Sequence, residues 1–118
     1  MLKFLGFSLE LFVDEVLYDD GSSVCSARDF EGGHWLIVQV DADPEHLVWV
    51  CAPISARALS RVAAGSATTR DAVRHSLTGT VQVVTVDHGR AVPDSCLCCA
   101  AIPDHLLPGM DCRVLVAA

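Results

Sequence analysis

Lysine occurs only once in the 118 residues, and the formal net charge is −7. So few cations argue against nucleic acid as the partner, because general binding to it needs Lys and Arg to displace counterions from phosphates. No apolar run approaches the roughly 20 residues that cross a bilayer, so no membrane partner is expected. The first ten residues resemble a secretion signal only superficially, since Glu10 and Asp14 interrupt the apolar run and no cleavage site follows. We therefore expect a cytoplasmic protein whose N-terminus is part of the fold.

The composition is that of an ordered, acidic domain. Apolar residues make up 52% of the chain and charged residues 19%, a balance that excludes disorder. The length is that of one ordinary domain, and with no linker or repeat we expect a single domain over 1–118. Ten acids and two bases lie in residues 1–50. We interpret this acidic half as a solvated surface, with a docking face for a basic partner as the alternative.

The first half of the chain predicts an antiparallel meander. Strands rich in β-branched and aromatic residues are expected over 9–18, 22–29, 34–40 and 46–51, because short turns of Asp, Gly and Pro separate them. Segment 9–18 also fits a helical period, so a helix remains open there.

Two short helices are predicted next. Ser55 is a plausible N-cap for a helix over 56–64, and Gly65 ends it in the left-handed conformation that glycine favours. Thr68 and Asp71 then fit a capping box, in which the hydroxyl caps a second short helix.

The sheet is expected to resume with a strand over 80–86, an irregular edge strand over 90–100 and a last strand over 113–116. Segment 103–108 fits a turn or a single helical turn. The order of strands, helices and strands predicts an α+β fold, an antiparallel β-meander with a short αα-hairpin inserted before the C-terminal strands.

Several short motifs between residues 18 and 73 resemble, by their order and spacing, a family of small uncharacterised bacterial domains. They are Tyr18-Asp19-Asp20-Gly21, Cys25 to Asp29, Trp35-Leu36, Asp41, Trp49-Val50, Pro53-Ile54-Ser55, Leu59, Gly65 and Thr69-Arg70-Asp71-Ala72. The resemblance covers about half of the chain. The sequence departs from the family pattern at Ser22, where members have proline, and its cysteine-rich C-terminal part has no counterpart in the family. It implies an α+β fold and a bacterial cytoplasmic setting, and no known activity.

Six cysteines are the most unusual feature of the composition. Cys96, Cys98 and Cys99 are clustered, and Cys96 and Cys99 have the C-x₂-C spacing of half a zinc site. A fourth ligand would come from one of three residues, His88, His105 or Cys112. We prefer the interpretation of the cysteines as small buried apolar residues, because no second C-x-x-C and no H-x₃₋₅-H is present. We therefore expect no cofactor and keep a zinc site as an alternative.

The sequence shows no catalytic pattern, since it lacks G-x-S-x-G, H-E-x-x-H and a glycine-rich phosphate loop. Segment 56–75 resembles a helix-turn-helix, which makes a DNA-binding regulator an alternative. The acidic composition and the missing third helix argue against it.

We therefore expect a non-catalytic protein–protein interaction or regulatory module whose partner is another protein or a second copy of the chain. The candidate interaction residues are charged and lie in the helical pair and in the meander: Arg57, Arg61, Arg70, Arg74, Asp19 and Asp20.

Overall fold

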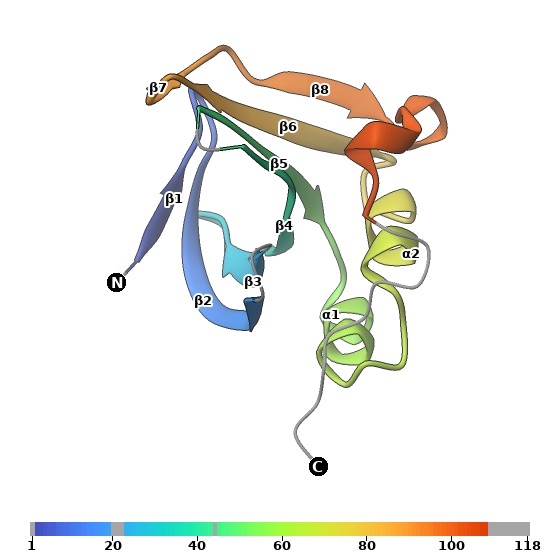
Figure 1. Ribbon diagram of the computed structural model, residues 1–118. Coiled ribbons are helices and arrows are strands. Elements are labelled where there is room, and N and C mark those ends of the chain that lie inside the picture. The colour runs from blue at the N-terminus through green and yellow to red at the C-terminus, as the bar shows by residue number, and fades with distance from the viewer. Residues whose placement is uncertain (1, 20–22, 44, 109–118) are drawn as a thin grey trace.

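A single curled antiparallel sheet forms most of the computed structural model, which describes residues 2–19, 23–43 and 45–108. The first six strands follow one another across the sheet in chain order: β1 (Lys3–Leu5), β2 (Glu10–Asp19), β3 (Ser23–Arg28), β4 (His34–Asp43), β5 (His46–Pro53) and β6 (Thr80–Asp87). Two short strands, β7 (Arg90–Ala91) and β8 (Ser95–Cys98), both pair with β6. The sheet bends into a half-barrel (Figure 1).

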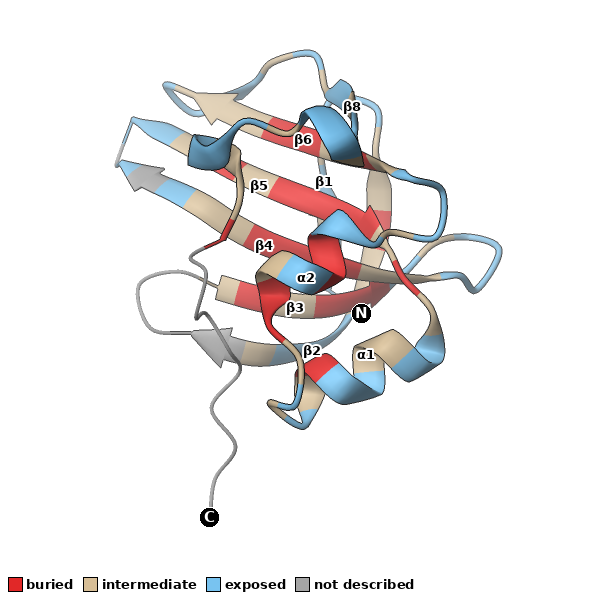
Figure 2. Ribbon diagram, turned by 90° about the vertical axis from the view of Figure 1, so that its right-hand side faces the viewer, coloured by how far each residue is buried: buried red, intermediate tan, exposed pale blue. Residues whose placement is uncertain are grey.

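Two short helices, α1 (Ala56–Ala63) and α2 (Thr69–Arg74), connect β5 to β6. Two single turns of 3₁₀ helix, η1 (Cys99–Ala101) and η2 (Asp104–Leu106), follow β8. Figure 2 shows α1 and α2 lying against the outer face of the sheet. No helix in the described part of the chain is long and apolar enough to span a membrane.

The predicted α+β class is wrong, because the fold is mainly β. The helical pair lies where the sequence placed it, but α1 has eight residues and α2 has six, too few to form a layer of their own. The physical reason is that the central strands are apolar on both faces, and the helices cover only one of them. The curling of the sheet buries the other face.

The outer face of the sheet forms the larger core cluster with the helices. Leu36 of β4 and Val50 of β5 are fully buried there against Val62 of α1 and Val73 of α2. Complete burial of each such side chain stabilises the folded state by about 1.5–3 kcal/mol. This packing holds the two short helices on the sheet.

The inner face forms a second cluster from alternate residues of the same strands, among them Leu11, Ile37 and Cys51. Phe4 of β1 and Trp49 of β5 meet edge to face with ring centroids 5.6 Å apart, although three strands separate them in the sheet. This contact across the inside of the half-barrel follows from the curvature of the sheet.

Segment 9–18, left open as strand or helix, is a strand from Glu10 onward, as part of β2, which confirms the strand alternative. Strand β4 runs three residues beyond the predicted 34–40, to Asp43. The sequence reasoning missed β1, and the broken edge strand expected over 90–100 is found as β7 and β8. The strand predicted over 113–116 lies outside the described residues.

Candidate docking groove between the two helices

Side-chain caps fix the beginning of each helix, as the sequence predicted. The Ser55 hydroxyl oxygen accepts a hydrogen bond from the Ala58 backbone N–H at 3.1 Å, and the Thr68 hydroxyl oxygen accepts one from the Asp71 backbone N–H at 3.1 Å. Gly65 follows the C-cap of α1 with φ +74°, a conformation that strains other residues. The chain therefore turns sharply after α1 and places α2 beside it.

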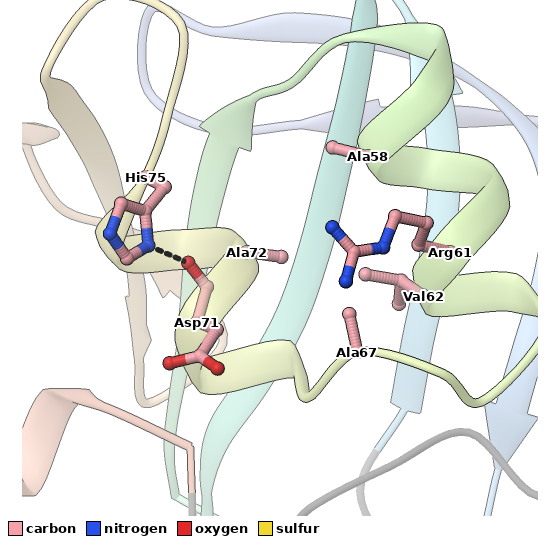
Figure 3. A pocket seen from close by; sticks show the side chains of 7 residues that line it. All are labelled: Ala58, Arg61, Val62, Ala67, Asp71, Ala72 and His75. Carbon is pink, nitrogen blue, oxygen red and sulfur yellow. Dashed lines mark hydrogen bonds between the residues drawn. The ribbon is translucent and has the colours of Figure 1, made fainter.

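A groove of about 320 Å³ lies between the two helices (Figure 3). Small or branched apolar side chains line it, namely Ala58, Val62, Ala67 and Ala72. Three polar residues complete the lining, Arg61, Asp71 and His75. An apolar floor with a charged rim is the anatomy of a protein–protein interface, in which the centre loses water and the rim remains solvated.

The rim of the groove carries one cation, Arg61, and one carboxylate, Asp71, together with the imidazole of His75. Figure 3 shows the Arg61 guanidinium reaching from α1 across the groove toward Ala72. The His75 Nδ1 lies 2.8 Å from the backbone carbonyl oxygen of Asp71. Because a carbonyl only accepts, Nδ1 carries the proton and Nε2 is the free acceptor of the neutral ring. The side chains of Arg61 and His75 are both exposed, so both can contact a ligand.

The four predicted arginines do not form one surface. Arg57, Arg61 and Arg74 are exposed, and none of them has an ion-pair partner within 4.0 Å among the residues that the structure describes. The side chain of Arg70 is only 17% exposed. It donates to Asp104 Oδ1 at 2.7 Å and to the Pro108 carbonyl at 3.2 Å. Arg70 therefore holds the segment after β8 against α2.

The two aspartates expected to interact cannot be placed. Asp19 ends β2, but its side chain lies outside the described part, and so does the whole of Asp20. The sequence reasoning missed the groove itself. Its signal was the presence of alanine at 58 and 72 on the two helices and at 67 between them, because small residues on neighbouring elements leave a hollow.

The three clustered cysteines, Cys96, Cys98 and Cys99, do not point toward one common site. Cys96 and Cys98 are exposed on β8, two residues apart and hence on the same face of the strand. The Cys99 Sγ turns toward α2, 3.4 Å from the Val73 carbonyl and 3.3 Å from Ser76 Oγ.

No three His, Cys, Asp or Glu side chains among the described residues are grouped so that they could hold a metal ion. His88 and His105 are both exposed, on the turn between β6 and β7 and in η2. The remaining candidate ligand, Cys112, lies outside those residues. The zinc site stays a prediction.

No family model matches this chain, and no match is found among curated proteins or among solved structures. The resemblance to the small bacterial domains therefore stays an expectation from the sequence.

Proposed function

We propose that this protein is a non-catalytic protein-interaction module that binds its partner in the groove between α1 and α2. One observation carries the proposal, the apolar floor formed by alanine and valine beneath the exposed Arg61 and His75. Such a groove can take one apolar side chain of a partner, while the rim contacts the residues on either side of it.

The charges of the helical pair favour an acidic partner segment. Arg57, Arg61 and Arg74 are exposed there, against the single carboxylate of Asp71. Opposite charges at the rim of an interface speed association and exclude wrong partners more than they add affinity. The partner is another protein, or a second copy of this chain presenting its acidic strands.

We place this activity in the cytoplasm. Four of the described cysteines, Cys51, Cys96, Cys98 and Cys99, are free thiols. Unpaired cysteines in this number are typical of a reducing compartment, where disulfides are rare.

Two features count against DNA binding by the helical pair. α2 has only six residues, which is short for a helix that must reach base edges in the major groove. Arg70, one of the four arginines expected at phosphates, is engaged by Asp104 and Pro108.

The test is a peptide-display selection against the immobilised protein, followed by binding assays with Arg61→Glu and with Arg57→Glu. We expect selected peptides to carry Asp or Glu beside an apolar residue, and to lose at least tenfold in affinity for Arg61→Glu. The matched control is Arg90→Glu, which makes the same charge change on β7, outside the residues that line the groove. Because the Arg61 side chain is exposed, the melting temperature of the Arg61→Glu variant should not fall below that of the unchanged protein.

Two outcomes would contradict the proposal. The first is a selection with no acidic enrichment, and the second is equal weakening of binding by Arg61→Glu and Arg90→Glu. Binding of a DNA duplex that both Arg57→Glu and Arg61→Glu abolish would favour the helix-turn-helix alternative instead.

A further inference from the structure

The turn between β3 and β4 carries an exposed aromatic ring on a fixed backbone. Phe30 lies in this turn with 75% of its surface exposed. The Asp29 carboxylate holds the turn by accepting three hydrogen bonds at 2.8–2.9 Å, from the N–H groups of Glu31 and Gly33 and from the Trp35 indole. The Asp29 N–H also donates to the Gly33 carbonyl at 3.0 Å. The ring is therefore presented on a rigid support, which lowers the entropy lost on binding.

Phe30 forms one wall of a hollow of about 200 Å³, and Phe12 of β2 forms another. The two rings meet edge to face, with centroids 5.1 Å apart and an interplanar angle of 88°. The rest of the lining is charged or small: Asp14, Arg28, Asp29 and Gly32. The hollow is thus an aromatic corner with carboxylates at its edge.

The charges around this hollow leave it negative. Arg28 is neutralised by Asp14, because its Nε and Nη2 each donate to a carboxylate oxygen of Asp14 at 2.9 Å. Asp29 has no cation paired with it in the described part of the chain. Its pKa is held below the ordinary value, chiefly by the Trp35 indole N–H and then by the Gly33 N–H. Asp29 is therefore ionised at neutral pH.

The protein already places a cation against this aromatic corner. The Lys3 Nζ lies 5.5 Å from the centroid of the Phe12 ring, while it forms an ion pair with Glu10 at 3.1 Å. The face of an aromatic ring attracts cations through its quadrupole. The Phe30 ring, which is far more exposed, has no such cation in the described structure.

We propose that the hollow between Phe12 and Phe30 binds a cationic side chain, an arginine, of a partner protein. The guanidinium would stack on the Phe30 ring with the Asp29 carboxylate at its edge, because both oxygens of Asp14 are already bound by Arg28. Arginine fits better than lysine, because its planar and weakly hydrated group stacks on aromatic rings. The net charge of −7 would steer such a partner toward the protein.

This surface is separate from the groove between the helices and does not depend on it. None of its lining residues lines the groove. An acidic ligand in the groove and a basic one in the hollow would be distinct partners or distinct parts of one partner.

The probe is the peptide acetyl-Gly-Ser-Arg-Ser-Gly-amide, titrated into the ¹⁵N-labelled protein and followed by NMR. Its control is the same peptide with citrulline, which keeps the shape of arginine but is neutral. We expect saturable shifts of the Glu31, Gly32 and Gly33 amides with the arginine peptide. We expect at least about threefold weaker binding of the citrulline peptide, since a cation–π contact contributes that much even at exposed sites.

Two variants separate a cation–π contact from simple apolar contact. Phe30→Ala should abolish the shifts, and Phe30→Leu, which keeps an apolar side chain but lacks the ring, should weaken binding by at least about threefold. Leu77→Ala, at another large exposed apolar residue, is the control and should bind as the unchanged protein does. The spectrum of each variant reports at the same time whether it is folded.

Equal binding of the arginine and citrulline peptides would overturn the proposal, as would unweakened binding to Phe30→Leu. Shifts that cluster at Ala58 and Ala72 instead of the β3–β4 turn would assign the peptide to the groove. Self-association that Phe30→Ala abolishes, without any peptide shifts, would assign the hollow to contact between two copies.

Discussion

Removal of the Asp94 carboxylate should open the half-barrel at one end. Asp94 lies between β7 and β8, and it accepts four hydrogen bonds from the loop between β1 and β2. The donors are the backbone N–H groups of Phe7, Ser8 and Leu9, at 2.9–3.0 Å, and the Ser8 hydroxyl at 3.0 Å. One side chain therefore joins the first two strands to the last two, across more than 80 residues of sequence.

The expected cost follows from these four bonds. A hydrogen bond to a charged group contributes about 1.5–3 kcal/mol, but the donors of this loop can bind water once the carboxylate is gone. We therefore expect Asp94→Ala to lower the free energy of unfolding by about 2–3 kcal/mol. With a typical denaturant dependence, this lowers the urea midpoint by about 1–2 M. Equilibrium unfolding in urea, followed by tryptophan fluorescence, measures the change, because Trp49 contacts Phe4 of β1.

The matched control is Asp41→Ala on β4, whose carboxylate is exposed and forms no ion pair with any other described residue. It should change the free energy of unfolding by less than about 0.5 kcal/mol. If Asp94→Ala were as stable as this control, the carboxylate would not close the half-barrel, and the reasoning would be refuted.

The pH dependence gives a second test of the same contact. Partial desolvation raises the pKa of Asp94, but the four hydrogen bonds to its ionised form outweigh that effect and hold the pKa below its ordinary value. Since the folded state then binds the proton less readily than the unfolded state, the stabilisation is fully present above the unfolded pKa of about 4. It is lost as the pH falls through the lower folded pKa. The difference between the unchanged protein and Asp94→Ala should therefore shrink below about pH 4.

Two further predictions concern the same inner face of the sheet. Gly6→Ala should destabilise the protein by about 1–2 kcal/mol, because an added Cβ would lie 2.9 Å from Asp94 Oδ1 and 3.0 Å from Val84 Cγ2. An unchanged urea midpoint would show that the loop can shift to accept the methyl group. Cys51 is fully buried, and burial raises the pKa of its thiol, so a disulfide reagent should label it only as the protein unfolds. Cys96, which is exposed, should react in the folded protein, and equal rates for the two thiols would contradict the structure.

The sequence correctly predicted those strands and helix ends that depend only on residues close together in the chain. β4 and β5 were visible as runs of β-branched and aromatic residues, and the helix starts were visible in Ser55 and Thr68, whose hydroxyls need only the next turn of chain. The fold class was wrong for a reason that no window of sequence contains. A strand that is apolar along its whole length must be buried on both faces. In this protein the helices bury one face and the curvature of the sheet buries the other, and that curvature is visible only in the assembled sheet.

The candidate sites show the same division. Arg57 and Arg61 were correctly predicted as exposed cations on a helix. Arg70 was not, because its side chain donates a hydrogen bond to Asp104, a residue 34 positions away. Phe12 and Phe30 attracted no prediction, because they come together only when β2 and β3 pair and the turn after β3 folds back. Contacts of this kind arise from strand register, and register is fixed by the whole sheet.

The edges of the sheet have a consequence for the behaviour of the protein at high concentration. In the described part of the chain, one side of the sheet ends in the three residues of β1 and in the part of β2 that β1 does not cover, where the register against β3 is broken twice. The other side ends in β7 and β8, with two and four residues. Pro93 and Asp94 interrupt the second edge, where a proline offers no N–H to a neighbouring chain. A long, regular edge would act as a template for strands of other molecules and start amyloid-like stacking. Short and broken edges deny that template, so a chain with 52% apolar residues can keep its extended, β-rich backbone from recruiting its neighbours.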